Sequence, residues 1–281
     1  MRTARLLRTR AEAGRLVAGW RARGLRVGLV PTMGALHEGH AALVRRAARE
    51  CDKIIVTIFV NPLQFGPNED YGRYPRALPA DRRLVAAAGA AAVYAPSVEE
   101  MYPKGFRTHV EVDGLSELYC GHYRPGHFRG VATIVLKLFN QLPADRAYFG
   151  EKDFQQVGIL ERMVRDLDVP IKIVRVPIVR ERDGLALSSR NMYLSPEQRA
   201  AAPALRAALE AGAAAGRRRG AGPRDVAAAV RRALSGTLLK PQYAVVADAG
   251  TLEPARDLSG PRRLLAAAYL GKTRLIDNIP L

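Results

Sequence analysis

Two histidines stand three residues apart in the stretch PTMGALHEGH, residues 31–40. The apolar run VGLV precedes this stretch and the helix-like run AALVRRAARE follows it, so the pair lies where a strand gives way to a helix. Side chains three apart at a helix start share one face, and helix N-termini attract anions. His37 and His40 are therefore candidate donors to a phosphate. The alternatives are an ordinary surface pair or part of a metal site, for which the stretch supplies only Glu38 as a further ligand.

The glycines of this stretch do not form either of the common phosphate-binding patterns. Neither Gly-x-x-x-x-Gly-Lys nor Gly-x-Gly-x-x-Gly follows the strand. Gly34 and Gly39 would still allow a nucleotide to approach the backbone closely. We therefore expect an anion site of a different type.

A second group of polar residues lies in GEKDFQQ, residues 150–156, at another strand-to-helix turn. Lys152 can neutralise a phosphate, Asp153 can accept from a ribose hydroxyl, and Gln156 follows three residues after Asp153. The alternative is a charge pair that caps the helix start.

Two further segments offer side chains suited to anions. LSSRN, residues 187–191, supplies two hydroxyls and a guanidinium, which could clamp the β- and γ-phosphates of a nucleotide. Gln64, in NPLQF, carries both a donor and an acceptor without a charge, although an isolated loop glutamine indicates little by itself.

The elements that must position these groups alternate along the first two thirds of the chain. RVGLV, KIIVTIFV, AAVYA, DRAYFG and IKIVRVPIV read as strands, with helical patterns between them. This alternation predicts βαβ units and a doubly wound parallel sheet, an α/β Rossmann-like fold. Pro177 interrupts the last strand, which is therefore expected at an edge or leaving the sheet.

The regular alternation of strand and helix patterns ends after about residue 178. Residues 195–236 read as two Ala/Arg-rich helices around the breaker RRRGAGP, with Ser195 as N-cap and Pro196 at the first helical position. The β-like runs QYAVVADA, RRLLAAAYLG and KTRLIDNI follow. We predict a larger domain over residues 1–178 and a smaller C-terminal α+β domain over residues 179–281.

Composition and charge exclude several classes of protein. Hydrophobic content of 48% with 25% charged residues is typical of a globular chain, and no apolar run is long enough to span a membrane. The net charge of +17 comes from arginines dispersed among alanines, which favours solvated faces over a nucleic-acid surface, although an acidic substrate would be attracted. Cys51 and Cys120 are too few for a disulfide framework, so a reducing cytoplasm is expected.

Longer motifs carry a resemblance to a known family. His-x-Gly-His at residues 37–40 resembles the nucleotidyltransferase signature shared with class I aminoacyl-tRNA synthetases. FVNPLQFGPNEDYGRYPR, RPGHFRGVATIVLKLFNQLPADRAYFGEKDFQQ, PIVRERDGLALSSRNMYLS and TRLIDN follow in that order. Together they closely resemble the pantothenate synthetase family, the pantoate:β-alanine ligases, from the first predicted helix to the last five residues.

The resemblance implies a reaction and a set of partners. Pantoate and ATP would form pantoyl adenylate and pyrophosphate, and the amine of β-alanine would then attack the acyl carbon and release AMP. It also implies Mg2+ dependence, a homodimer, and a C-terminal domain that acts as a lid over an ATP- and pantoate-binding domain. Nucleic acid and membrane partners are not expected. The alternatives are another nucleotidyltransferase and, on charge alone, a nucleic-acid-binding protein.

The resemblance also assigns roles to residues. His40, His37, Lys152 and Arg190 are expected to be catalytic, and Gln64 and Gln156 to contact pantoate or β-alanine. The expected ATP contacts are Met33, Gly34, Ala35, Leu36, His37, Glu38, Gly39, His40, Gly150, Glu151, Lys152, Asp153, Val179, Leu187, Ser188, Ser189 and Arg190. Leu187 stands where most relatives have Met, a swap of similar size.

Three other residues are left outside the expected site. Arg124 and His127 of RPGHF could serve either the fold or the indirect organisation of the site. Asp81 could help to hold Mg2+, but a carboxylate in the first turn of a helix is the simpler interpretation. Mg2+ is expected to be held mainly by the ATP phosphates.

Overall fold

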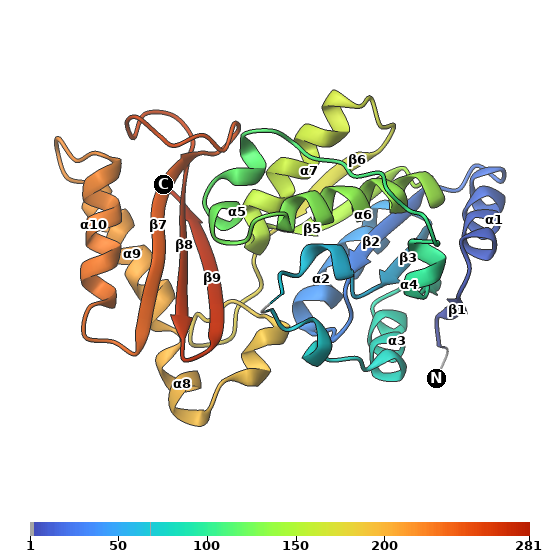
Figure 1. Ribbon diagram of the computed structural model, residues 1–281, viewed down its shortest axis with the longest axis horizontal. Helices are drawn as coiled ribbons and strands as arrows, with labels where there is room; N and C mark the ends of the chain where they lie inside the picture. The colour runs from blue at the N-terminus through green and yellow to red at the C-terminus, as the bar shows by residue number, and fades with distance from the viewer. Residues whose placement is uncertain (1–2, 68) are drawn as a thin grey trace. The chain divides into compact units, whose positions relative to one another are not determined.

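The computed structural model describes residues 3–67 and 69–281. Contacts between residues divide the chain into two compact units, which are described separately here (Figure 1). The first unit comprises the chain up to Glu151 together with Ile159–Pro177, and the second comprises Lys152–Gly158 and Ile178–Leu281. The functional domains expected over residues 1–178 and 179–281 stay a prediction.

Six parallel strands form the sheet of the first unit, in the order β1-β4-β3-β2-β5-β6. They are β1 (Arg5–Leu7), β2 (Val27–Thr32), β3 (Lys53–Ile58), β4 (Ala92–Tyr94), β5 (Arg146–Gly150) and β6 (Lys172–Val176). The chain leaves β2 toward β3 and β4 on one side and later reaches β5 and β6 on the other. Strand β2 therefore lies at the topological switch point, where open α/β sheets bind ligands beyond their carboxyl ends. The predicted α/β class is confirmed.

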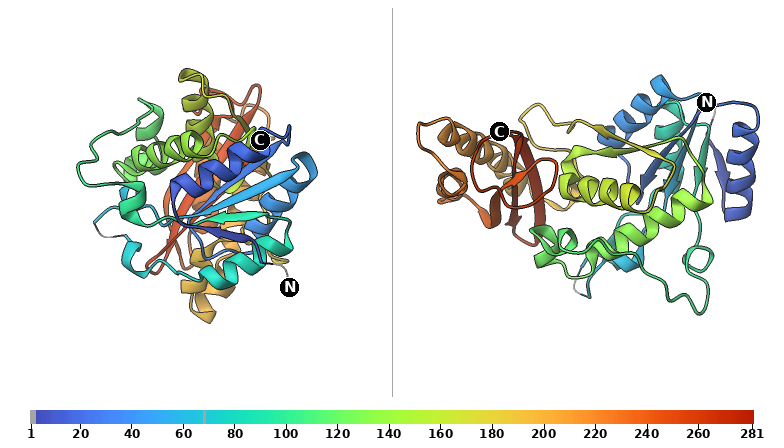
Figure 2. Two further views of the ribbon diagram at one scale, coloured as in Figure 1. Left: turned by 90° about the vertical axis from the view of Figure 1, so that its right-hand side faces the viewer. Right: turned by 90° about the horizontal axis from the view of Figure 1, so that it is seen from above.

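Helices cover both faces of this sheet. Helices α2 and α3 pack on one face and α1 lies beside α6 on the other (Figure 2). The α-helices up to β6 are α1 (Arg10–Arg21), α2 (Glu38–Glu50), α3 (Leu78–Ala87), α4 (Val98–Met101), α5 (Cys120–Tyr123), α6 (His127–Gln141) and α7 (Phe154–Asp166). The 3-10 turns among them are η1 (Pro62–Gln64), η2 (Tyr71–Arg73), η3 (Leu115–Glu117) and η4 (Glu151–Asp153). Helix α2 illustrates the pattern, since Ala41, Val44 and Ala47 recur at helical spacing and are buried.

Two strands differ from the sequence prediction. Strand β2 continues through Pro31 to Thr32, although it was expected to end at Val30. Proline is tolerated there because β5 pairs only with Gly28 and Leu29, so the missing N–H of Pro31 interrupts no ladder on that side. Strand β1 was not predicted, because its three residues, Arg5–Leu7, lack the β-branched, apolar character that marked the equally short β4. Strand β6 ends at Val176 on the sheet edge, as Pro177 predicted.

The second unit holds a three-stranded antiparallel sheet in the order β7-β8-β9. Its strands are β7 (Leu239–Asp248), β8 (Arg262–Leu270) and β9 (Thr273–Pro280), and its other elements are η5 (Ser189–Tyr193), α8 (Pro196–Ala201), α9 (Ala204–Gly216) and α10 (Pro223–Leu234). Helices α9 and α10 pack on the sheet around buried Leu209, Val230 and Leu264. The C-terminal α+β arrangement is thus confirmed.

The helical segment of the second unit contains three helices instead of the two expected. Pro203 has no N–H to continue the hydrogen-bond ladder, and α8 ends at Ala201 before α9 begins at Ala204. The predicted start of α8 is confirmed, because Ser195 is its N-cap and exchanges side-chain hydrogen bonds with Gln198. Across residues 3–67 and 69–281, no helix combines the length and apolar character that crossing a membrane requires.

Candidate active site

The stretch from Met33 to His40, which is the loop after β2 and the first turn of α2, lies at the switch point of the sheet. Gly34 has a φ of +89° and Ala35 one of +51°, so the chain passes through two left-handed residues before the helix begins at Glu38. A Cβ on Gly34 would lie 3.1 Å from Ile58 Cγ2 and 3.2 Å from Asp81 Oδ2. Glycine is therefore required there for both conformation and space.

The side chain of Asp81, in the first turn of α3, forms hydrogen bonds to the backbone of this loop. Its Oδ2 accepts from the N–H of Ala35 at 3.0 Å and its Oδ1 from the N–H of Leu36 at 2.8 Å. The carboxyl is 3% exposed, and burial raises its pKa against the opposing effect of the two N–H donors. Asp81 does lie in the first turn of a helix, as expected. Its hydrogen-bond partners, however, are Ala35 and Leu36 in the loop before α2, where a phosphate is expected to bind.

The two histidines are oriented by the start of α2. His37 is the N-cap, and its Nδ1 accepts from the N–H of Gly39 at 3.2 Å. The N–H of His37 in turn donates to Nδ1 of His40 at 3.3 Å, and the ring centroids are 4.1 Å apart. Since both Nδ1 atoms accept, the proton of each neutral imidazole is on Nε2. Each ring can then offer an Nε2–H donor to an anion.

Gln64 ends the η1 turn, which follows β3, and its side-chain amide is held at both ends. Oε1 accepts from Asn61 Nδ2 at 3.0 Å, and Nε2 donates to Met33 Sδ at 3.0 Å. Asn61 is 1% exposed, and its Oδ1 accepts from Tyr102 Oη at 2.8 Å. The structure thus brings two predicted site residues, Gln64 and Met33, into contact and adds Asn61, which sequence reasoning missed.

The main chain of Gln64 is held by the RPGHF segment. Arg124 donates to both oxygens of Glu69, at 2.6 and 2.5 Å, and to the Gln64 carbonyl at 3.4 Å. It also donates to His127 Nε2 at 2.9 Å, so the His127 proton lies on Nδ1 and reaches the same carbonyl at 2.8 Å. Burial opposes the charge of Arg124, but the interactions with Glu69 and Cys120 together raise the pKa of the guanidinium above its ordinary value.

Close packing supports the same turn. A Cβ on Gly130 of α6 would lie 2.3 Å from the Leu63 carbonyl oxygen and 2.7 Å from the Gln64 nitrogen. Any other residue at position 130 would therefore displace η1. Arg124 and His127 also hold the turn that contains Gln64, and whether they serve the fold or the organisation of the site stays open.

In the second unit, Lys152 and Asp153 lie in the η4 turn and approach each other, with Nζ 3.7 Å from Oδ2. The carbonyl of Lys152 accepts from Asn278 Nδ2 at 3.0 Å. Gln156 follows in α7 and belongs to this unit, whereas Gln64 belongs to the first.

Val179 and Leu187 were both expected to contact ATP, and the structure brings them together. The N–H of Leu187 donates to the Val179 carbonyl at 3.0 Å, closing a turn whose tip is Gly184, with a φ of +91°. Arg180 and Ala186 pair as an antiparallel bridge inside this turn. The η5 segment follows directly, and Ser188 caps it by accepting from the N–H of Arg190 at 3.3 Å.

No group of three or more His, Cys, Asp or Glu residues suited to a metal occurs in the described part of the chain. The two oxygens of Asp81 already accept backbone N–H groups. The protein residues therefore fit a cation that arrives with a substrate better than one held in a cage of side chains.

Comparison with known proteins identifies the family. The model of the pantoate-beta-alanine ligase family matches residues 5–280. A pantothenate synthetase from Moorella thermoacetica is 54% identical over 281 residues, covering 98% of each chain. The chain belongs to the pantoate-beta-alanine ligase family.

Solved structures agree with this assignment. The crystal structure of pantothenate synthetase from Thermus thermophilus matches with a TM-score of 0.90 and 48% identity, covering 98% of each chain. A pantoate-beta-alanine ligase from Francisella tularensis, crystallised with beta-gamma ATP and beta-alanine, matches with a TM-score of 0.81 and 32% identity, covering 98% of this chain and 97% of that one. This pantoate-beta-alanine ligase therefore forms pantothenate in an ATP-dependent reaction.

The ligase thus combines predicted residues with supporting residues that local patterns did not reveal. Asn61 and Asn278 are supporting residues of this kind, whereas Asp81 had been considered only as a possible Mg2+ ligand or a first-turn carboxylate. NPLQF and TRLIDN were noted as motifs, yet only Gln64 of the first was given a role. The roles of the predicted contact residues toward ATP and pantoate remain predictions.

Proposed function

We propose that the ligase activates pantoate as pantoyl adenylate, with ATP phosphates bound at the start of α2. The observation that carries this proposal is that Nδ1 of His37 and Nδ1 of His40 each accept a backbone N–H, which assigns the proton of each neutral ring to Nε2. The two rings stand beside the N-terminal N–H groups of a 13-residue helix at the switch point of the sheet. The beta-gamma ATP bound by the Francisella enzyme supports a nucleotide site of this kind.

In the first step, a pantoate carboxylate oxygen attacks the α-phosphorus of ATP, and the bond from that phosphorus to the bridging oxygen of pyrophosphate breaks. Nε2–H of His40 donates to a phosphate oxygen and stabilises the charge that grows on the leaving group. Lys152, Ser188, Ser189 and Arg190 neutralise or hydrogen-bond the phosphates. When bound with ATP, Mg2+ would supply further neutralisation of the phosphate charge.

In the second step, the β-alanine nitrogen attacks the acyl carbon, and the bond from that carbon to the AMP oxygen breaks. The amine proton leaves to solvent. The polar amides of Gln64 and Gln156 suit the hydroxyls and carboxylate of pantoate because they add no competing charge. In this proposal, residues 179–281 act as the lid that keeps water from the adenylate.

Two further properties belong to the proposal. We expect a homodimer, which sedimentation or light scattering of the purified protein would test. We also expect a cytoplasmic protein, and Cys51 and Cys120, which are buried and not joined in a disulfide, agree with a reducing compartment.

The decisive experiment is ATP–pyrophosphate exchange with labelled pyrophosphate, Mg2+ and pantoate, and without β-alanine. Exchange that requires pantoate would support the separate adenylation step. Absence of exchange in a protein that releases AMP once β-alanine is added would contradict a freely reversible adenylate. Exchange without pantoate would contradict pantoate as the group that is adenylated.

A further inference from the structure

We propose that strand β9 positions both phosphate-binding segments of the second unit, through two neighbouring residues, Asp277 and Asn278. The inference rests on the proposed function, in which Lys152 and the Val179–Arg190 segment contact ATP. Neither strand residue need touch the nucleotide. Each acts through a protein group that the contacts identify.

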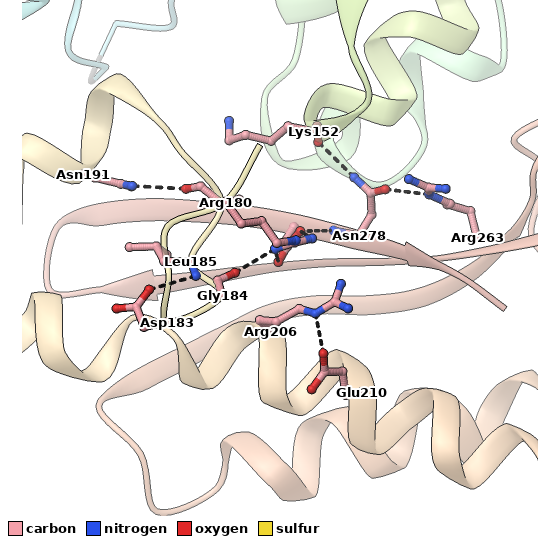
Figure 3. A network of polar contacts seen from close by, with 12 residues as sticks. Lys152, Arg180, Asp183, Gly184, Leu185, Asn191, Arg206, Glu210, Arg263 and Asn278 are labelled. Atoms are coloured by element: carbon pink, nitrogen blue, oxygen red, sulfur yellow. Dashed lines mark hydrogen bonds and ion pairs between the residues drawn. The ribbon is translucent and has the colours of Figure 1, made fainter. Parts of the chain in front are cut away.

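Asn278 acts on the main chain of Lys152. Its Nδ2 donates to the Lys152 carbonyl at 3.0 Å, and its Oδ1 accepts from Arg263 Nε at 2.6 Å (Figure 3). The guanidinium of Arg263 also lies over the ring of Phe154, 4.5 Å from its centroid. Because both ends of the Asn278 amide are bonded, the side chain cannot rotate without breaking a buried hydrogen bond. Asn278 therefore fixes the position of the η4 backbone relative to β9, and the Lys152 side chain extends from that backbone.

Asp277 acts on the turn that brings Val179 and Leu187 together. Its two oxygens accept from Nη1 and Nη2 of Arg180, at 2.7 and 2.8 Å. Nη1 also donates to the Gly184 carbonyl at 2.9 Å, at the tip of the turn. The two hydrogen bonds to Asp277 fix the orientation of the Arg180 guanidinium. The guanidinium in turn fixes the position of the Gly184 carbonyl.

The position of Asp277 on the strand makes this ion pair unusual. Alternate residues of a strand face the same side, so Asp277 shares a face with Leu275 and Ile279 of the apolar core. Its side chain is 3% exposed and that of Arg180 is 20% exposed. A carboxylate on a core face is costly unless it is paired, and an apolar residue would suit the core at least as well. Its presence therefore points to a requirement outside the core, at the turn.

The two residues are also coupled to each other. The N–H of Asn278 donates to Asp277 Oδ1 at 2.7 Å, and the two side chains leave opposite faces of the strand. One short piece of β9 thus sets the relative position of Lys152 and of the turn before Ser188 and Arg190. In this proposal, the last two residues of the TRLIDN motif position the two ATP-contacting segments.

The test uses the full-length ligase with two conservative variants, Asn278→Asp and Asp277→Asn. The first replaces the donor to the Lys152 carbonyl by an acceptor, and the second removes one charge-assisted bond to Arg180. Each should raise KM for ATP on the order of tenfold, because a buried hydrogen bond to a binding segment is lost. KM for β-alanine should stay within about twofold of wild type, as expected when only ATP-contacting segments move.

A merely structural role gives a different result. If the variants only unfold a fraction of the molecules, the maximal rate falls in proportion and every KM is unchanged. Asp248→Asn is the matched control, since Asp248 is also paired with an arginine, Arg262, on the same sheet but outside the two segments. Unchanged KM for ATP in both strand variants, or an equal rise in the control, would overturn the inference.

A double variant separates this inference from the function on which it rests. Lys152→Ala should itself impair ATP use, and adding Asn278→Asp should then raise KM for ATP little further, because the side chain that Asn278 positions is gone. If Lys152→Ala has no effect, the proposed phosphate contact fails. If Lys152→Ala impairs ATP use but the strand variants do not, only the role of β9 fails.

Discussion

Two buried carboxylates, Asp81 in the first unit and Asp277 in the second, hold candidate binding segments by different means. Asp81 bonds directly to the N–H groups of Ala35 and Leu36. Asp277 reaches its segment through Arg180, because the group to be held there is the Gly184 carbonyl. A carboxylate cannot bond to a carbonyl, since both only accept. The difference shows what decides the arrangement. A carboxylate can hold a loop N–H directly, but it needs an arginine in between when the loop presents a carbonyl.

The Gln64 turn follows the same logic within the first unit. There the group to be held is again a carbonyl, and Arg124 stands between it and the carboxylate of Glu69. The arginine-mediated arrangement therefore holds a candidate binding segment in each of the two units, at segments of unrelated sequence. Four experiments, in order of decreasing expected effect, would break or sharpen this comparison.

Arg180→Met should give the largest change, in stability. It leaves Asp277 buried without its cation, which typically costs about 3–5 kcal/mol of unfolding free energy. Urea unfolding measures the loss, and Arg206→Met, which removes an exposed i,i+4 pair with Glu210, should cost only about 0.3–0.5 kcal/mol. Adding Asp277→Leu to Arg180→Met should restore most of the stability. A loss below about 1 kcal/mol for Arg180→Met would mean that Asp277 does not depend on its partner.

His40→Ala tests the loop that Asp81 holds. It removes one oriented donor and should lower kcat by roughly 10²- to 10³-fold, equivalent to about 2.7–4 kcal/mol. Steady-state rates measure this effect, and circular dichroism should show an unchanged fold. His122→Ala, which removes an exposed ring in edge-to-face contact with Tyr123, serves as the control. Near-wild-type turnover in folded His40→Ala protein would exclude the proposed role.

Gln64→Ala tests the turn held through Arg124. Losing one neutral hydrogen-bonding side chain is worth about 0.5–1.5 kcal/mol, so KM for pantoate should rise roughly 2- to 12-fold. KM for ATP should change less, because the amide faces pantoate in the proposed site. Initial rates with each substrate varied in turn give both values. Equal changes in the two KM values would show that Gln64 has been assigned to the wrong substrate.

The smallest effect concerns pH and Asp81. Burial raises its folded-state pKa above the ordinary 3.8, so between these two values the folded protein binds more protons than the unfolded chain. The contribution of Asp81 to stability therefore falls as pH rises through this window. Measured by urea unfolding, wild type should lose stability relative to Asp81→Asn between pH 4 and pH 7. A relative gain over that range would mean that the N–H donors dominate and lower the pKa.

Local patterns in the sequence predicted most of the fold. The spacing of apolar residues identified the helices that pack on the parallel sheet, Pro177 marked an edge strand, and Ser195 marked a helix start. These features depend on neighbours within a few positions, which a single sequence displays. Pro203 was visible too, but its effect on the surrounding alanine-rich run was underestimated.

The supporting residues of the site could not be predicted in this way. Asp277 and Arg180 are 97 positions apart, Asn278 and Lys152 are 126 apart, and Asp81 lies 46 positions from Ala35. Contacts of this range depend on the tertiary fold and leave no local periodicity. The candidate residues themselves were found through motif resemblance, whereas the groups that hold them required the structure.

The left-handed conformation of Ala35 affects the ligase even before a nucleotide binds. An L-residue with positive φ costs roughly 1–2 kcal/mol, which glycine would avoid. Glycine, however, would increase the conformational entropy of the chain to be ordered, at a cost of about 0.5–1 kcal/mol relative to alanine. On these magnitudes the strain of alanine exceeds its entropic advantage, and glycine at position 35 would be favoured by up to about 1.5 kcal/mol. Alanine restricts the backbone conformations of the unliganded loop more than glycine would. Less conformational entropy is then lost when a nucleotide binds in the proposed site.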